Sequence, residues 1–137
     1  MSYLLDTSTC VAIIRPRTPL VRRRAADALA RGERLMVSSV VLHELWYGVH
    51  KSARIQENTA KLLSFLSSYV EICPLDAQDA RTAGEVRAEL ERRGLIIGAY
   101  DTLIAGHCLN RGFTFVTGNI AEFKRIKGLR LLEDWTK

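Results

Sequence analysis

Cysteine is scarce in this chain of 137 residues, and long apolar runs are missing. The three cysteines, Cys10, Cys73 and Cys108, are odd in number and widely spaced, and no Cys-x-x-Cys pair is present. They are therefore interpreted as buried core thiols rather than as disulfide partners or metal ligands. No apolar run approaches the ~20 residues that cross a bilayer, and the N-terminal residues lack the basic start and apolar core of a signal peptide. A cytoplasmic protein without a membrane span is expected.

Several motifs of established chemistry are also absent. There is no P-loop and no Gly-x-Gly-x-x-Gly sequence. His43-Glu44 could begin the His-Glu-x-x-His motif of metalloproteases, but Tyr47 occupies the position of the second histidine. A phosphoaspartate enzyme would require a second aspartate at the position of Ser8. No internal repeat, low-complexity tract or linker divides the sequence, so a single domain over residues 1–137 is expected.

Basic residues outnumber acidic ones, with 20 Lys and Arg against 15 Asp and Glu, a net charge of +5 and a pI of about 9.4. This balance favours a polyanionic partner such as nucleic acid, although many surface arginines are only solvated. The candidates for contact with RNA phosphates come from an early and a late basic cluster: Arg22, Arg23, Arg24, Lys124 and Arg125.

Apolar runs and helix-ending residues predict alternating strands and helices. Strands are expected at residues 3–5, 35–37, 70–72, 113–117 and 129–132, and helices at 10–14, 19–31, 39–51, 55–68, 76–93, 101–110 and 121–125. Strands separated by helices indicate a parallel sheet with helices on both faces. The predicted fold is a three-layer α/β/α domain with a central parallel sheet of four to five short strands. In such sheets, sites form beyond the carboxyl ends of the strands.

Three carboxylates stand beside apolar residues, where an isolated charge is costly. Asp6 ends the apolar run at residues 3–5, Glu44 lies at the apolar stripe of one predicted helix, and Asp101 opens another helix. Three carboxylates in one pocket would repel one another strongly, and a divalent metal ion is the usual remedy. The pattern therefore indicates a metal site built from oxygen ligands.

Each of these acids has a structural alternative. Asp6 and Asp101 stand where a side chain could cap a helix N-terminus, although the hydroxyl residues 7–9 are equally good caps in place of Asp6. Glu44 could form an ion pair with one of the many arginines. His107 is interpreted as a polar residue at the edge of its helix.

A polar block follows the strand predicted at residues 113–117. Thr117 and Asn119 stand past the carboxyl end of this strand. They could position water or phosphate, or they could form only a turn and a helix cap. Glu122 is either an outer acid of the metal site or a solvated helix residue.

Four ordered blocks of sequence resemble the PIN-domain ribonucleases, specifically the VapC toxins of type II toxin–antitoxin pairs. The blocks are Leu-Leu-Asp-Thr-Ser at Asp6, Ser-Ser-Val-Val-Leu-His-Glu-Leu-Trp-Tyr-Gly at Glu44, Ile-Gly-Ala-Tyr-Asp-Thr-Leu-Ile-Ala-Gly-His at Asp101, and Val-Thr-Gly-Asn-Ile-Ala-Glu-Phe at Asn119. The likeness runs nearly from end to end, and four blocks at family-like separations are a specific signal.

The resemblance implies an endoribonuclease that depends on Mg²⁺ or Mn²⁺ and acts on structured RNA such as tRNA. It also implies a cognate antitoxin that silences the enzyme, and a toxin homodimer within the complex. By the same resemblance, Asp6, Glu44 and Asp101 are the catalytic and metal-binding acids, with Asp6 and Asp101 as direct ligands. Glu44 would ligate through water or orient the attacking water. A fourth acidic position of the family falls on Asn119, with Glu122 nearby. The supporting positions are Thr7, Asn119 and Glu122.

Two other functions use the same residues. A DNA nuclease or a structure-specific nuclease could carry the same acids. RNA differs from DNA by its 2′-hydroxyl, and these acids do not show whether the protein contacts that group. A nucleic-acid-binding module without catalysis would carry them as structural groups. Metal-dependent cleavage of RNA separates the enzyme from the module.

Overall fold

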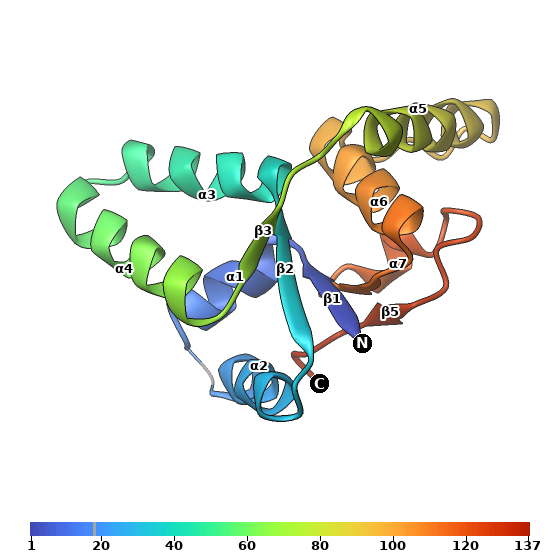
Figure 1. Cartoon of the computed structure of the whole chain (residues 1–137). Coiled ribbons are helices and arrows are strands. Elements are labelled where there is room, and N and C mark those ends of the chain that lie inside the picture. The colour runs from blue at the N-terminus through green and yellow to red at the C-terminus, as the bar shows by residue number, and fades with distance from the viewer. Residues whose placement is uncertain (18) are drawn as a thin grey trace.

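The central sheet has five strands: β1 (Ser2–Leu5), β2 (Arg34–Ser38), β3 (Glu71–Cys73), β4 (Thr114–Val116) and β5 (Leu132–Glu133). All neighbours pair in parallel in the order β3-β2-β1-β4-β5. The computed structural model describes residues 1–17 and 19–137, and it places helices on both sides of this sheet (Figure 1). The predicted three-layer fold with a parallel sheet is therefore confirmed.

Seven helices connect the strands in the described part of the chain. They are α1 (Thr7–Ile14), α2 (Leu20–Ala30), α3 (Ser39–Lys51), α4 (Ile55–Ser68), α5 (Ala77–Arg92), α6 (Ala99–Arg111) and α7 (Ile120–Phe123). Helices α1, α3 and α4 lie on one side of the sheet in Figure 1, and α5, α6 and α7 lie on the other. Within the described residues, none of these helices combines the length and apolar character that a membrane span requires.

Four predicted boundaries were wrong by two or three residues, and one of them is the end of α7, which falls at Phe123 instead of residue 125. Helix α1 begins at Thr7 instead of residue 10, because Asp6 itself caps it. Helix α6 begins at Ala99 instead of residue 101, since the carbonyl of Gly98 already accepts the first helical hydrogen bond. Strand β5 is shorter and later than the predicted 129–132, because the backbone N–H of Leu129 bonds back to the turn that follows α7.

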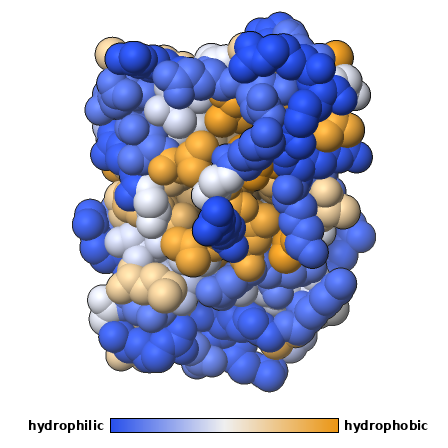
Figure 2. Space-filling model, turned by 90° about the vertical axis from the view of Figure 1, so that its right-hand side faces the viewer, coloured by the Kyte–Doolittle hydropathy of each residue, from blue (hydrophilic) through white to orange (hydrophobic). Residues whose placement is uncertain are grey.

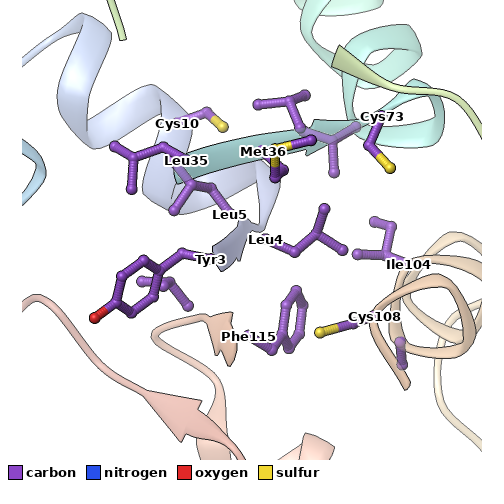
Figure 3. Packing of buried hydrophobic residues seen from close by; sticks show 14 of the residues in the cluster. Tyr3, Leu4, Leu5, Cys10, Leu35, Met36, Cys73, Ile104, Cys108 and Phe115 are labelled. Carbon is purple, nitrogen blue, oxygen red and sulfur yellow. The ribbon is translucent and has the colours of Figure 1, made fainter. Parts of the chain in front are cut away.

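The middle strand β1 is buried from both sides (Figure 3). Leu4 and Leu5 are inaccessible to solvent, and they pack with Leu35 of β2 and Phe115 of β4. Leu4 is paired in register with Met36 on one side and with Phe115 on the other. An uninterrupted apolar run is typical of a parallel strand that is covered on both faces, which is why so short a segment specifies the centre of the fold.

The three cysteines are free and buried, as predicted. Cys10, Cys73 and Cys108 all carry free thiols, and they lie in the same apolar cluster (Figure 3). Burial raises the pKa of Cys108 to about 12, so this thiol stays neutral and behaves as a small apolar side chain.

Helices α5 and α6 approach each other closely at a glycine. A Cβ atom on Gly106 would lie 2.4 Å from the Cα atom of Ala83. We expect Gly106→Ala to lower the free energy of unfolding by about 1–3 kcal/mol or more, because the two helices must separate to admit the methyl group. Urea unfolding followed by circular dichroism measures this change.

A neighbouring glycine provides the matched control. Gly84 lies on the exposed face of α5, and a Cβ atom there would meet nothing within 4 Å. Gly84→Ala should therefore stabilise the helix by roughly 0.5–1 kcal/mol through helix propensity alone. Equal effects of the two substitutions would contradict the close approach of the helices.

Candidate active site

The acidic residues gather where the sheet reverses its strand order. The chain steps outward from β1 through β2 to β3, and β4 then returns to pair with the other side of β1. Asp6 follows β1 directly, and its backbone N–H donates to the carbonyl of Val116 at the end of β4, with an N···O distance of 3.0 Å. The crevice beyond the carboxyl ends at such a switch point is the usual ligand site of an open parallel sheet.

Asp6 holds the start of α1 with one of its two carboxylate oxygens. Its Oδ1 accepts from the backbone N–H of Thr9 at 2.8 Å and from the hydroxyl of Ser8 at 3.1 Å. Asp6 therefore does cap α1, as its structural alternative proposed, and the hydroxyl residues 7–9 do not supply the cap. Capping fixes the orientation of the carboxylate, and it leaves Oδ2 as the oxygen for a further ligand.

Glu44 projects from α3 toward the start of α1. The hydroxyl of Thr7 donates to Glu44 Oε1 at 2.8 Å. The partner of this half-buried carboxylate is thus a threonine hydroxyl, and not the arginine that a structural ion pair would require. Thr7 and Asp6 are consecutive, so the hydrogen bond links Glu44 to the end of β1.

Asp101 lies in the first turn of α6. It does not cap the helix, because the N-cap position is occupied by Gly98. Burial raises the pKa of Asp101, and the negative charges of Glu122, Glu44 and Asp6 raise it further. Three carboxylates from three other segments therefore lie close enough to Asp101 to disfavour its charged form.

The polar block after β4 orders the fourth of these acids. The Thr117 hydroxyl accepts from the backbone N–H of Asn119 at 3.0 Å. The side-chain amide of Asn119 in turn donates to Glu122 Oε2 at 3.0 Å. Asn119 thus holds a glutamate whose negative charge acts on Asp101.

The carboxylate oxygens of these acids suit a hard divalent cation, although they do not yet surround a common point at which a metal ion could bind. Carboxylate oxygens are the ligands that Mg²⁺ and Mn²⁺ prefer. Burial and the neighbouring acids both raise the pKa of Asp101, and a bound cation would offset both effects. Across residues 1–17 and 19–137, no three histidine, cysteine, aspartate or glutamate side chains are already arranged as a metal site. Ligation by these acids would therefore involve rotation of their side chains.

The predicted RNA-binding residues lie in two different places. Arg22 donates through Nε and Nη2 to the carbonyl of Ile13, at 2.9 and 2.6 Å, and so closes the C-terminus of α1. Its helix α2, which also carries Arg23 and Arg24, lies at the end of the molecule opposite the first turns of α3 and α6 (Figure 1). Lys124 and Arg125 are exposed and follow α7, the helix of Glu122. A role in RNA binding stays a prediction for all five residues, and the distance of α2 from the acids makes its arginines the weaker candidates for contact near the cleavage site (Figure 1).

A buried polar network behind the acids was missed by the sequence analysis. His107 is fully buried, so its predicted place at a helix edge was wrong. Its Nδ1 lies 2.9 Å from Ser38 Oγ, and its Nε2 lies 3.3 Å from both Cys73 Sγ and Asp79 Oδ2. Burial lowers the pKa of His107, and the charge of Asp79 offsets only part of this effect. The ring is therefore neutral at pH 7 and ties together three segments behind the site.

This fold and site define a parallel α/β domain with carboxylates at its switch point, and family comparison matches residues 3–129 to the PIN domain. The chain belongs to the PIN-domain family, in its VapC group. It is 45% identical to the ribonuclease VapC2 of Rickettsia felis over the whole of both chains. It is 40% identical to the tRNA(fMet)-specific endonuclease VapC of Salmonella typhimurium over 98% of each chain.

Solved structures of the same group have the same fold. The VapBC2 complex of Rickettsia felis, bound to a DNA fragment from its promoter, contains a chain that matches with a TM-score of 0.91 at 44% identity, over 98% of this chain and 99% of that one. The DNA-bound VapBC complex of Salmonella typhimurium contains one that matches with a TM-score of 0.90 at 40% identity, over 98% of each chain.

Proposed function

We propose that this chain is a metal-dependent endoribonuclease that acts as the toxin of a toxin–antitoxin pair, with tRNA as its expected substrate. The observation that carries the proposal is the gathering of Glu122, Glu44 and Asp6 near Asp101 at the switch point of the sheet, where burial and the three negative charges together raise the pKa of Asp101. The named activities of the Rickettsia and Salmonella relatives support RNA, and in one case tRNA(fMet), as the substrate.

The residues divide the work of phosphodiester hydrolysis among them. Asp6, through Oδ2, and Asp101 would hold a Mg²⁺ or Mn²⁺ ion, which when bound supplies positive charge to stabilise the phosphate under attack. Thr7 orients Glu44 by donating to Oε1, so Oε2 is left to accept a proton from an attacking water. Asn119 fixes Glu122 by a hydrogen bond, and Glu122 would add a fourth negative charge to the site formed by Asp6, Glu44 and Asp101.

Cleavage assays test this proposal directly. The wild-type protein should cleave purified tRNA(fMet) when Mg²⁺ or Mn²⁺ is present, and EDTA should stop the reaction. Cleavage of single-stranded DNA at the same rate would favour the broader nuclease. Binding of RNA without any metal-dependent cleavage would favour the non-catalytic module.

A groove beside the acids fits a protein partner. A cavity of about 150 Å³ lies between α1, α3 and α4, and it begins at Thr7 and Glu44. Its remaining wall is mainly apolar, with Val11, Leu45 and Leu62 among the lining residues. The similar chains from Rickettsia and Salmonella were solved as VapBC complexes. We infer that a cognate antitoxin covers this groove and so closes the acidic site.

Pairing of two toxin chains within that complex is part of the same proposal. On the side of the molecule in Figure 2, apolar surface gathers in the middle and hydrophilic side chains frame it. Helices α3 and α4, on the other side of the sheet in Figure 1, expose two further large apolar side chains, Tyr47 at 60% and Leu63 at 52%. Light scattering of the toxin–antitoxin complex tests the pairing, because a single toxin copy per complex would contradict it.

Salt dependence should reveal which basic residues contact the RNA. We expect Lys124→Gln combined with Arg125→Gln to reduce the magnitude of the log–log salt slope by about 1.4, if each contacts one phosphate of a single strand. The physical reason is that fewer condensed counterions are released on binding. Filter binding on cleavage-dead Asp101→Asn protein measures the slope without interference from cleavage.

The matched control removes two charges from α2. Arg23→Gln combined with Arg24→Gln changes the net charge equally, but at the opposite end of the molecule (Figure 1). Its slope should stay close to that of the parent. Equal flattening by both pairs would indicate a general charge effect and not local phosphate contacts.

A further inference from the structure

Two pairs of side chains lie across the contact between α3 and α6. One pair consists of the acids Glu44 and Asp101, whose charges interact. The other consists of His43 and Tyr100, each one residue earlier on its helix, with ring centroids 5.6 Å apart. An aromatic pair therefore adjoins the acidic pair at the same helix contact.

The aromatic pair is placed at the surface rather than in the core. Tyr100 is 50% exposed, and His43 is also exposed. The two rings are inclined by 58° to each other, so neither ring covers the other as a parallel stack would. An exposed ring leaves a face open to solvent, and a nucleobase can stack on such a face.

We propose that His43 and Tyr100 form a stacking site for an unpaired nucleobase next to the cleaved phosphate. This inference rests on the proposed ribonuclease function and adds a subsite to it. The acids act on the phosphate, and the base of an adjoining nucleotide is the part of the substrate that would reach the rings. Single-stranded RNA is typically held by stacking of splayed bases on aromatic side chains. The site thus selects for an unpaired base at the cleavage point.

A comparison of two probes isolates the stacking contribution. The first is an oligoadenylate of about twelve nucleotides, and the second is an abasic ribose–phosphate oligomer of the same length and charge. Both are bound to Asp6→Asn protein in Mg²⁺, because this background removes cleavage and keeps a side chain that can cap α1. We expect the background protein to prefer the oligoadenylate by about tenfold or more.

Substitutions at Tyr100 should change that preference selectively. Tyr100→Leu should remove most of the preference while leaving affinity for the abasic probe unchanged, and Tyr100→Phe should retain it because the ring remains. His43→Leu should reduce it in part, since Tyr100 loses its neighbouring ring. Tyr47→Leu is the matched control, because Tyr47 is an exposed tyrosine on α3 whose ring is covered by the Lys51 ammonium group and does not pair with His43.

Three results would overturn the stacking site. The first is an absent base preference, or one that survives Tyr100→Leu. The second is an equal loss of affinity for both probes, which would show a structural role. The third is a Tyr100→Leu variant that keeps the base preference but binds the antitoxin more weakly, which would assign the rings to a protein interface. None of these depends on cleavage, whereas failure of the proposed function appears as wild-type protein that cleaves no RNA in Mg²⁺.

Discussion

Asp101→Asn should abolish RNA cleavage and leave the fold intact. The substitution keeps the shape of the side chain but removes a charge that would hold a metal ion. Loss of groups that merely support metal ligands costs about 10–100-fold, so loss of a ligand itself should cost at least a hundredfold in kcat/KM. The melting temperature without metal should stay the same or rise, because burial and the neighbouring negative charges both disfavour the charged form of Asp101, and asparagine carries no charge. Initial rates on tRNA and thermal melts measure both effects.

Two substitutions of Asp6 separate its catalytic role from its capping role. Asp6→Asn should abolish cleavage with little change in stability, because asparagine also caps helices well. Asp6→Ala should abolish cleavage and also destabilise the protein by about 1 kcal/mol, since the N–H of Thr9 loses its acceptor. Cleavage by either aspartate-to-asparagine variant at the wild-type rate would remove these residues from the active site.

The fold could be predicted well because the apolar runs and helix-ending residues in the sequence agree with the way in which the strands and helices pack. The apolar run at residues 3–5 is too short to stand alone, yet it became the buried centre of the sheet because helices cover it on both faces. The same alternation of runs also indicated that Asp6 would lie at a carboxyl edge. The pairing of β4 beside β1 brings Asn119 and Glu122 to that edge as well.

Long-range contacts were the part that the sequence could not supply. The hydrogen bond from Thr7 to Glu44 joins residues that are 37 positions apart, and no spacing rule specifies it. His107 resembled a surface residue because its helix carries polar side chains at both ends. Its burial depends on Ser38, Cys73 and Asp79, which come from three other segments of the chain.

Arg111→Met should destabilise the protein more than any other substitution considered above. Arg111 donates to Asp79 Oδ1 through Nε at 3.0 Å and to Oδ2 through Nη2 at 2.9 Å. Burial acts to raise the pKa of Asp79, but the hydrogen bonds from Arg111, the backbone N–H of Asp76 and Asn110 outweigh it, so the pKa lies well below its usual range. Removal of the arginine leaves a buried charge without a counterion, which typically costs 3–5 kcal/mol. Urea unfolding at pH 7 measures this loss.

The pH dependence and two controls identify the cause of that loss. Because the folded pKa of Asp79 is depressed, the pair contributes stability above the unfolded pKa of ~3.9, and the advantage of the wild type should shrink as the pH falls below it. Arg81→Met, which breaks an exposed pair with Glu85 at 3.6 Å, should cost no more than about 0.5 kcal/mol. In an Asp79→Asn background, Arg111→Met should cost clearly less than in the wild type, because no buried charge is then left unpaired. A loss of the same size in both backgrounds would show that Arg111 stabilises the fold by packing and not through its charge.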